Sequence, residues 1–448
     1  MTAGLPAPDG SGTAAPPVWW PVAVSAEVTT APRRVVAGEH AFTAFRAAPG
    51  EPVSVVSERC PHRLVKLAHG TVVGGRLRCP YHGWEFGGDG ACVLIPSSGP
   101  GAEVPPRARL QRPWGVREQD GTVWVAPAPP GGGAAPPDLR ATEETFTNLD
   151  PSLRFGWHPV ALGDEVPPGG EPLGVRLLGE RLTVHRSVGG ELRVEPQPAA
   201  VRERFGVIWI APEPPRVALF DAPDDDDPGF ARGWLVPERS ASPAGVLADN
   251  FLDVAHFPFV HAGTFGAAEE PYVPPFDVRV EGDELTSVQE QWFDNPEDPG
   301  VIAGLRPVRQ RRRATYVYRA PFQLLLRLEE LDAGAVKTIL FFLQPEDLRS
   351  TRIYTKMLLH NIGGVAVPGP EVVAREVAFE VAVLGEDLAL QAAMSVTGLP
   401  LRMRDELHVR SDRSGIALRR ILRRWSGLDP APEPTPGPAP AASPARPR

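Results

Sequence analysis

Short runs of alternating apolar and polar residues fill the first 130 residues of the chain. Residues 53–56 and 122–125 are two such runs, and glycine or proline separates most of them. A period of two residues is typical of a strand that buries one face. We therefore expect a small antiparallel β domain over residues 18–130.

From Gly233 onward the pattern predicts longer strands and two helices. Apolar residues recur every three or four positions from Pro370 to about Met394, which predicts a long helix that begins at the proline. A second helix is expected from Gly245 to His256. Strands are predicted over residues 278–292, 314–318, 323–328, 336–343 and 351–359. The expected architecture of residues 233–428 is α+β, with a curved antiparallel sheet around the long helix in a helix-grip arrangement.

The segment 151–215 repeats features of the first domain. Residues 19–23, WWPVA, return as residues 157–161, WHPVA, and residues 121–127 return as residues 206–212. Self-similarity at two separated places predicts a second copy of the same β unit. This copy is shorter than the first, contains no cysteine and keeps only His158 and His185, so we expect it to bind no metal and to serve packing.

Three segments are expected to lie outside these units. Residues 1–17 and 429–448 are rich in alanine and proline and are predicted to be disordered tails. Residues 131–150 are predicted to be a linker. The second unit is extended to residue 232 by an acidic loop, Asp224 to Asp227, whose side chains are expected to be solvated.

Charge and cysteine content exclude several classes of protein. A formal net charge of −9 over 448 residues argues against nucleic acid or an anionic membrane as partner. There is no secretory signal pattern and no apolar run of membrane-spanning length, so a cytoplasmic location is expected. Three cysteines give no disulfide framework, and Cys92 is predicted to be a buried free thiol.

Two short motifs carry the first candidate chemistry. Cys60 and His62 form C-x-H, and Cys79 and His82 form C-x-x-H. Two thiolates and two imidazoles are the ligand set of a [2Fe–2S] cluster in which histidines replace cysteines on one iron. Each loop contributes one Cys and one His, so two hairpin tips can hold the cluster from opposite sides. A tetrahedral zinc site is the alternative, because zinc accepts the same side chains.

A second motif lies in the sequence Asn250 to His261. Asp253 and His256 are three residues apart and are expected to share a helix face. Pro258 is expected to break the helix and bring His261 to the same metal as His256. Two imidazoles and a carboxylate form the facial triad of non-haem Fe(II). The alternative is a pair of core histidines with no metal.

The residues around both motifs resemble a known family. CPHR, CPYHGWEF and GACVLIP resemble the Rieske iron–sulfur domain, and DNFLDVAHFPFVHAGTFG resembles the iron-binding stretch of the oxygenase α subunits of Rieske non-haem iron oxygenases, in their monooxygenase and O-demethylase branch. The second copy would then be a degenerate Rieske-like β unit, inserted between the linker and the catalytic domain.

The resemblance implies roles for individual residues. His256 and His261 would bind the mononuclear iron, Asn250 and Asp253 would act in catalysis, and Asp253 would bridge the two metal centres. The third iron ligand would be Asp387, with Glu386 as the competing assignment. The resemblance also implies a head-to-tail homotrimer in which His82 and Asp253 come from neighbouring chains.

The sequence also bears on the source of electrons and on the expected function. The sequence contains no dinucleotide-binding fingerprint and no plant-type ferredoxin cysteine run, so electrons from NAD(P)H are expected to arrive through an external reductase, with or without a ferredoxin. The expected function is that of a terminal oxygenase that uses O2 to hydroxylate, demethylate or oxidatively cyclise a small organic substrate. A Rieske-type electron carrier and a non-catalytic scaffold are the competing hypotheses.

Overall fold

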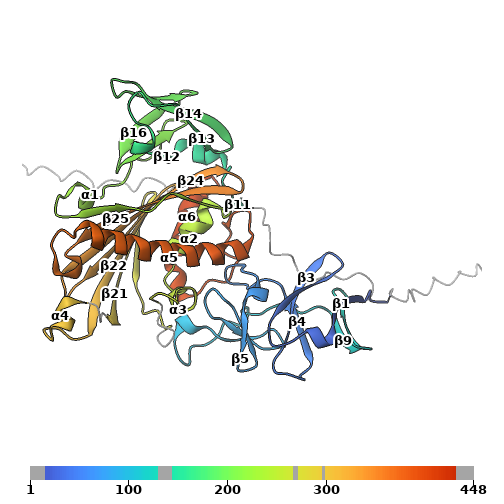
Figure 1. Cartoon of the computed structure of the whole chain (residues 1–448). Coiled ribbons are helices and arrows are strands. Elements are labelled where there is room, and N and C mark those ends of the chain that lie inside the picture. Colours follow the sequence, from blue (N-terminus) through green and yellow to red (C-terminus); the bar gives the residue numbers. More distant parts are fainter. Residues whose placement is uncertain (1–15, 130–143, 266–270, 295–297, 430–448) are drawn as a thin grey trace, which may run out of the picture.

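The computed structural model describes residues 16–129, 144–265, 271–294 and 298–429. The predicted tails and most of the predicted linker therefore lie outside the described residues. The described chain forms an N-terminal β domain, a middle β unit and a C-terminal α+β domain (Figure 1). The three units lie in the predicted order along the chain.

The N-terminal domain is built from three small antiparallel sheets, as predicted. Their strand orders are β1-β10-β9, β2-β3-β4 and β5-β6-β7-β8. The alternation that predicted them is visible in β2, where Val35 and Ala37 are buried and Arg34 and Val36 are exposed. The strands are β1 (Trp20–Val24), β2 (Arg33–Ala37), β3 (His40–Arg46), β4 (Val53–Ser57), β5 (Thr71–Val73), β6 (Arg76–Arg78), β7 (Glu85–Phe86), β8 (Cys92–Leu94), β9 (Gly115–Gln119) and β10 (Thr122–Ala126).

The middle unit repeats two of these three sheets. Its orders β12-β17-β16 and β13-β14-β15 match β1-β10-β9 and β2-β3-β4. The register shift between Pro21 and Ala23 in β1 recurs between Pro159 and Ala161 in β12. The strands are β12 (His158–Leu162), β13 (Leu173–Leu177), β14 (Glu180–Arg186), β15 (Leu192–Glu195), β16 (Ala200–Arg204) and β17 (Val207–Ala211). The two units thus share the order of strand pairing in two sheets, and residues 151–215 contain no counterpart of β5 to β8.

One large antiparallel sheet forms the C-terminal domain. Its order is β18-β25-β24-β23-β22-β21-β20, and β19 also pairs with β25. The strands are β18 (Ala231–Trp234), β19 (Glu238–Ser240), β20 (Asp277–Glu281), β21 (Glu284–Asp294), β22 (Arg309–Arg319), β23 (Gln323–Glu330), β24 (Ala335–Asp347) and β25 (Ser350–His360). The helices are α2 (Ala244–Phe251), α3 (Phe257–Val260), α4 (Pro299–Ile302), α5 (Pro370–Met394) and α6 (Arg413–Trp425). The long helix α5 has the predicted bounds.

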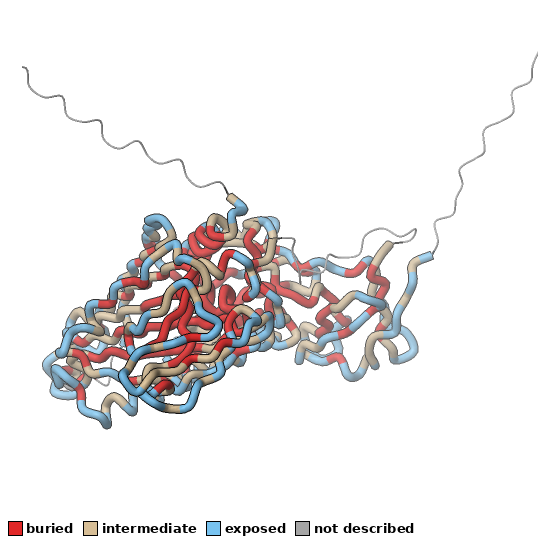
Figure 2. The backbone as a smooth tube through the Cα atoms, turned by 90° about the horizontal axis from the view of Figure 1, so that it is seen from above, coloured by how far each residue is buried: buried red, intermediate tan, exposed pale blue. Residues whose placement is uncertain are grey.

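Each face of this sheet is covered by a different part of the chain. Leu324 and Phe341 point to the side of α2, α5 and α6, in the largest apolar cluster. Leu325 and Phe342 point to the opposite side and pack with Trp209 of the middle unit. Figure 1 shows α5 across one side of the sheet and the middle unit against the other. The middle unit therefore packs against the C-terminal sheet. Figure 2 shows the buried segments in the interior of the molecule and exposed segments along its outer edges.

Three sequence predictions are corrected by the fold. Residues 144–150 are not linker, because β11 (Thr145–Phe146) pairs with β26 (Leu399–Pro400). The predicted strand 278–292 is two strands, since Gly282 turns the chain between β20 and β21 with a φ of +57°. The acidic segment contains a short helix, α1 (Pro223–Asp226). Its first two aspartates are paired, Asp224 with Arg327 at 2.9 Å and Asp225 with Lys356 at 2.6 Å, rather than solvated.

The N-terminal domain docks on the C-terminal domain of the same chain through its Cys/His loops. The backbone N–H of Leu407 donates to the carbonyl of Pro61 at 2.8 Å, and the N–H of Val273 donates to the carbonyl of Ser97 at 3.1 Å. The Ser411 hydroxyl lies 3.0 Å from the Ser97 hydroxyl. Both predicted metal motifs therefore come to one junction.

Candidate metal centres

Two tight turns present the four predicted cluster ligands. The N–H of Leu64 donates to the Cys60 carbonyl at 3.0 Å, and the N–H of Gly83 donates to the Cys79 carbonyl at 3.2 Å. Leu64 and Gly83 both adopt positive φ angles, 57° and 65°. These turns fold each Cys-Pro segment back so that cysteine and histidine project together.

The four side chains meet in a buried cluster. The rings of His62 and His82 lie with centroids 4.3 Å apart, and the thiols of Cys60 and Cys79 are hydrogen-bonded to each other. All four residues are buried. The Nδ1 atoms of both histidines are buried and have no hydrogen-bond partner among the described residues. Two thiols and two free imidazole nitrogens in one place fit a [2Fe–2S] cluster held by two Cys and two His.

Burial controls the protonation of these ligands. It lowers the pKa of His62 to about 4, so the imidazole is neutral and its lone pair is available to a metal. Burial also raises the pKa of the Cys60 thiol, and the neighbouring Cys79 adds to this effect. Cys92, predicted to be a buried free thiol, is buried beside them, and burial raises its pKa to about 12.

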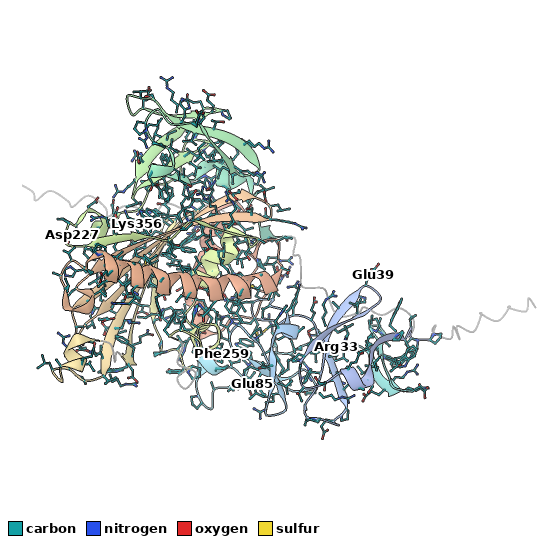
Figure 3. All side chains as sticks on the ribbon, in the orientation of Figure 1. Arg33, Glu39, Glu85, Asp227, Phe259 and Lys356 are labelled. Carbon is teal, nitrogen blue, oxygen red and sulfur yellow. The ribbon has the colours of Figure 1, made fainter. Side chains whose placement is uncertain are left out.

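Glycine is required at position 83 for a further reason. A Cβ atom there would lie 2.2 Å from the ring of Phe259 in α3. Figure 3 shows Phe259 in the C-terminal domain at the junction and Glu85, two residues beyond Gly83, in the N-terminal domain. The His82 loop therefore packs directly against the element that carries the second metal motif.

The second centre brings together His256, His261 and Asp387. The Nε2 atoms of the two histidines are 3.2 Å apart, and each lies 3.4 Å from Oδ1 of Asp387. Donors that each lie about 2.1 Å from one metal at right angles are roughly 3 Å apart, so the triangle fits a facial site. His256 and His261 are 2% and 1% exposed. Two imidazoles and one carboxylate are the donor set of non-haem Fe(II).

The local structure differs from the predicted helix. Helix α2 ends at Phe251, so Asp253 and His256 do not share a helix face. The Asp253 carboxylate instead accepts hydrogen bonds from the backbone N–H groups of Ala255 and His256, at 2.8 and 3.1 Å, which favours a turn over helix. Pro258 lies in the first turn of α3, where its missing N–H costs nothing, and so it begins a helix rather than breaking one.

Each ligand of the second centre is held by a further side chain. Nδ1 of His256 lies 3.1 Å from Asp253, and Nδ1 of His261 lies 2.8 Å from Glu386. Glu386 thus contacts the back of His261, while Asp387 faces the two Nε2 atoms. Asn250 donates to Asp387 at 3.1 Å and accepts from Gln391 at 2.8 Å. Such outer partners fix the orientation of metal ligands.

The charges at the second centre shift the pKa values of its ligands. The pKa of His256 is raised to about 9, because Asp253 and Asp387 outweigh the opposing effect of burial. The pKa of Asp387 is lowered: burial opposes its ionisation, but His256 and His261 more than compensate. The negative charge of Asp253 and Asp387 around the two imidazoles would favour a bound cation at the triad.

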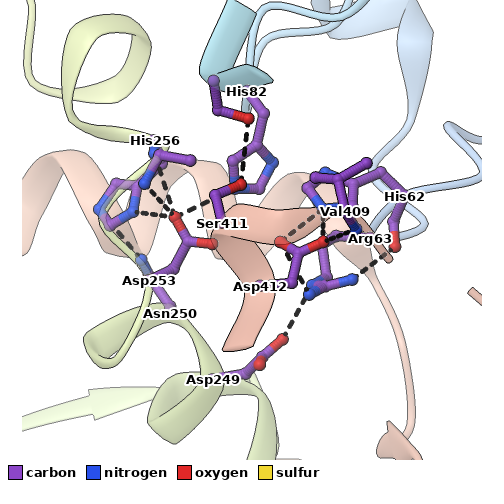
Figure 4. A network of polar contacts seen from close by, with 12 residues as sticks. His62, Arg63, His82, Asp249, Asn250, Asp253, His256, Val409, Ser411 and Asp412 are labelled. Carbon is purple, nitrogen blue, oxygen red and sulfur yellow. Dashed lines mark hydrogen bonds and ion pairs between the residues drawn. The ribbon is translucent and has the colours of Figure 1, made fainter. Parts of the chain in front are cut away.

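Asp253 joins the two centres. Its Oδ1 lies 3.2 Å from Nε2 of His82 and 3.1 Å from Nδ1 of His256 (Figure 4). In this structure of one chain, both residues come from the same chain, because the Cys/His loops dock on the C-terminal domain that follows them in sequence. That neighbouring chains of a trimer supply them stays a prediction.

Sequence reasoning missed a second carboxylate at the junction. Asp412, at the start of α6, lies 3.0 Å from Nε2 of His62 and 3.2 Å from Arg63 (Figure 4). Asp412 follows His62 by 350 positions, and no motif marks it. Each of the two cluster histidines therefore has a carboxylate from the C-terminal domain at its outer nitrogen.

A buried ion-pair network continues from Arg63 and was also missed. Arg63 lies 3.2 Å from Asp249 in α2, and Asp249 lies 2.6 Å from Arg419 in α6. Arg419 is 0% exposed and also contacts Glu406 at 2.6 Å. No sequence pattern predicts this network, because its four members come from four separate segments of the chain. It fixes the cluster loop to α2 and α6 of the C-terminal domain.

Comparison with known families agrees with both centres. Residues 18–110 match the Rieske [2Fe-2S] domain, and residues 240–427 match the vanillate O-demethylase oxygenase C-terminal domain. The first match contains all four cluster residues. The second contains His256, His261 and Asp387. Among the described residues, the helices are too short or too polar to cross a bilayer.

Curated relatives match parts of the chain. Methylxanthine N1-demethylase NdmA of Pseudomonas putida is 41% identical over 76 residues, which cover 17% of this chain and 21% of that protein. The probable methylxanthine N7-demethylase NdmC of Pseudomonas sp. (strain TJI-51) is 29% identical over 282 residues, 60% of this chain and 92% of that protein. Four of the curated relatives are matched over only 12% to 25% of their own length.

Solved structures resemble the chain at low identity. NdmA of Pseudomonas putida CBB5 with caffeine shares 20% identity with a TM-score of 0.41, and the match covers 91% of this chain and 90% of that one. By its N-terminal Rieske [2Fe–2S] domain and its vanillate O-demethylase-type C-terminal domain, which carry the ligands for a cluster and for a mononuclear iron, the chain belongs to the Rieske oxygenase α subunits.

Proposed function

We propose that this protein is the terminal oxygenase of a multicomponent Rieske system. The observation that carries the proposal is the position of Asp253 between His82 of the cluster site and His256 of the iron site, at 3.2 and 3.1 Å. When bound, the cluster supplies single electrons and the iron supplies a place for dioxygen activation. A simple electron carrier would have no use for the triad of His256, His261 and Asp387.

The residues of this chain have distinct roles in the proposal. Cys60, His62, Cys79 and His82 hold the cluster, and His256, His261 and Asp387 hold the iron. Asp253 orients His256 and His82 and links the two centres. Asn250 positions Asp387, and Glu386 positions His261. The buried surroundings exclude water from the link between the centres.

The proposed substrate is a small organic molecule, and demethylation is the favoured outcome over hydroxylation or oxidative cyclisation. Support comes from the family of the C-terminal domain and from the demethylase names of the partly matching relatives. Electrons come from NAD(P)H through an external reductase, with or without a ferredoxin. A cytoplasmic location suits this role, because a reducing compartment keeps the ligand thiols available.

We further propose that the middle unit is a degenerate Rieske-like copy and that the protein forms a homotrimer. Mixing two inactive variants, His82→Ala and Asp253→Ala, tests whether His82 contacts Asp253 within one chain or between neighbouring chains of the trimer. If His82 contacts Asp253 only within a chain, the mixture stays inactive. If neighbouring chains supply these residues, dissociation and reassociation of the mixture restores part of the activity.

The experiment that tests the function begins with anaerobic reconstitution of iron and sulfide. The reconstituted protein should contain three irons per chain and show a Rieske-type EPR signal after reduction. A generic reductase and NADH should then support substrate-dependent oxygen uptake. Two irons per chain without oxygen uptake would favour an electron carrier, and a colourless zinc protein from iron-replete cells would contradict the cluster.

A further inference from the structure

Three side chains on one face of the C-terminal sheet each have a polar atom without a hydrogen-bond partner among the described residues. Buried atoms of Ser287, Gln289 and Arg312, namely Oγ, Nε2 and Nε, make no hydrogen bond to any described residue. Ser287 is 0% exposed. Buried polar groups almost always have a hydrogen-bond partner in the protein, in ordered water or in a ligand. Three unpaired groups on adjacent strands therefore offer hydrogen-bond donors to a molecule bound against this face.

Strand register places these three groups on the same face. Ser287 and Gln289 of β21 lie opposite Tyr316 and Ala314 of β22, and Arg312 is two residues before Ala314. Residues two apart on a strand, and residues directly opposite on the next strand, point to the same side. The three side chains therefore share the side to which Tyr316 points.

That side is the side of the iron site. The ring of Tyr316 packs edge-on against Phe251 of α2, with centroids 6.2 Å apart. Phe251 follows Asn250, which donates a hydrogen bond to Asp387. On the same face, Lys337 of β24 lies opposite Leu328. Lys337 contacts Glu376 at 2.7 Å, and Glu376 belongs to α5, the helix that also carries Asp387. The face thus looks toward α5 and the triad.

Apolar side chains occupy the rest of the face. Leu326 lies opposite Tyr316, and Leu328 lies opposite Ala314. Both are only partly buried, which leaves apolar surface available. Phe341 stacks on Phe251 with centroids 4.8 Å apart. A mainly apolar wall with a few polar groups at one edge is typical of a site for a small organic ligand.

Charge on this face disfavours an anion. Arg312 is already paired with Glu330 at 3.2 Å, and Lys337 is paired with Glu376. Glu380 of α5 has no hydrogen bond or ion pair to a described residue, and burial raises its pKa; Lys337 opposes this effect, and Asp387 adds to it. A carboxylate ligand would lie near the acidic residues of this face, and the two cations named above, Arg312 and Lys337, are already paired with acids.

We propose that Ser287, Gln289 and Arg312 form a hydrogen-bonding site that orients an uncharged substrate through an oxygen or nitrogen acceptor, such as a ketone, amide or ring oxo group. The hydrocarbon part of the substrate lies against Leu326, Leu328 and Phe341. This proposal rests on the proposed oxygenase function and names its substrate class. The three residues are specificity-determining residues, outside the metal-ligand set.

The test compares three probes of similar size by equilibrium dialysis against the reconstituted protein. Para-methoxyacetophenone carries a neutral acceptor, para-methoxybenzoate carries an anionic one, and para-ethylanisole carries none at that position. The ketone should bind the parent protein most tightly. Tighter binding of the benzoate, or binding of none of the three, would overturn the assigned substrate class.

Variants then locate the binding preference. Ser287→Ala, Gln289→Leu and Gln289→Glu should each weaken ketone binding roughly 3- to 10-fold, the usual net effect of one lost hydrogen bond. Para-ethylanisole binding should be unchanged in all three. Gln289→Glu keeps the size of the side chain and replaces the amide donor with an acceptor. It therefore tests the hydrogen bond even if the other substitutions disturb folding. Matched controls are Thr286→Ala on the other face of β21 and Gln119→Leu, which is exposed in β9.

The outcome separates this proposal from the oxygenase function. If the variants bind the ketone as tightly as the parent while the parent consumes oxygen with a reductase, the site is wrong and the function stands. If the variants lose ketone binding but the parent neither consumes oxygen nor discharges its reduced cluster, the site stands and the oxygenase function is wrong.

Discussion

Nε2 of His82 lies 3.2 Å from Oδ1 of Asp253, and the same oxygen lies 3.1 Å from Nδ1 of His256. One carboxylate oxygen therefore contacts a ligand of each proposed metal centre. The pKa of Asp253 is held well below its usual range: burial opposes ionisation, but His82 and His256 outweigh it. The carboxylate is thus fixed as an anion between two imidazoles, which suits a link that orients both rings.

The first prediction concerns this link. Asp253→Asn removes the charge and weakens both contacts without removing a metal ligand. Loss of an outer partner of this kind typically costs about 10- to 100-fold in metal affinity or activity, and we expect activity to fall more than iron content. Iron analysis and single-turnover kinetics on the reduced protein measure the two effects. Asp89→Asn, at an exposed aspartate of the same chain, is the control. Parent-like cluster discharge in Asp253→Asn would contradict the link.

The second prediction separates the two acids on α5. Asp387→Ala should remove the mononuclear iron and leave the Rieske EPR signal intact, because only Asp387 faces both Nε2 atoms. Glu386→Gln should retain iron with an affinity lowered about 10- to 100-fold, because Glu386 supports His261 from behind. Iron per chain after dialysis against a chelator distinguishes them. Iron loss in Glu386→Gln with retention in Asp387→Ala would reverse the assignment.

The third prediction concerns the carboxylate at His62. Asp412→Asn removes a buried anion 3.0 Å from a proposed cluster ligand. Since reduction adds negative charge to the cluster, loss of this anion should shift the reduction potential in the positive direction. A redox titration followed by EPR measures the shift. Asp405→Asn in the preceding segment is the control, because Asp405 pairs with Arg402 and not with a cluster residue. An unchanged or more negative potential would argue against an electrostatic role.

Local sequence predicted the parts of this site that lie close together in the chain. The pairs Cys60 with His62 and Cys79 with His82 were found because a turn brings residues two or three apart to one metal. His256 and His261 are also close in sequence, and the bounds of α5 follow from apolar residues that recur every three or four positions. The helix predicted over Gly245 to His256 is present but ends at Phe251. The Asp253 carboxylate accepts hydrogen bonds from backbone N–H groups beyond that point, a local competition that apolar periodicity does not register.

Contacts between distant segments gave no local signal. Asp412, Arg419 and Asp249 carry ordinary charges in the sequence. The pairing of α2 with α6 and the docking of Arg63 from the N-terminal domain bring them together. The same holds for Ser287 and Gln289, whose importance depends on strand register with β22. Repetition was the exception: residues 19–23 and 157–161 share enough sequence for the middle unit to be predicted, and the strand pairing of both copies agrees.

The fourth prediction tests the buried network. Arg419→Met leaves Asp249 and Glu406 buried without their main partner, and breaking such a pair typically costs about 3–5 kcal/mol of unfolding free energy. Arg420→Met, at the exposed neighbour, should change stability little. Adding Asp249→Asn and Glu406→Gln to Arg419→Met should recover part of the loss, because the uncompensated charges are gone. Chemical denaturation of the parent and the three variants measures these differences, and equal stability of Arg419→Met and the parent would contradict the network.

The last prediction concerns acid sensitivity in the middle unit. His158 is 0% exposed and its Nε2 lies 2.7 Å from the Leu153 carbonyl. Burial lowers its pKa from 6.5 to about 4 in the folded protein, and the Leu153 contact offsets this only in part. The unfolded chain therefore binds a proton between pH 6.5 and 4 that the folded chain rejects. The stabilising effect of the neutral ring is complete above pH 6.5 and declines as the pH falls toward 4, by up to about 1.4 kcal/mol per pH unit.

His158→Gln keeps a donor for the Leu153 carbonyl and cannot titrate, so its unfolding free energy should fall less steeply between pH 6.5 and 4 than that of the parent. Denaturant titrations at several pH values measure the difference between the two proteins, in which the contributions of all other histidines cancel. His185→Gln, at a half-exposed histidine of the same unit, is the matched control. Parallel pH profiles for His158→Gln and the parent would show that burial of His158 does not control acid stability. The contribution of the middle unit to stability would then have to come from its apolar contacts with the C-terminal sheet alone.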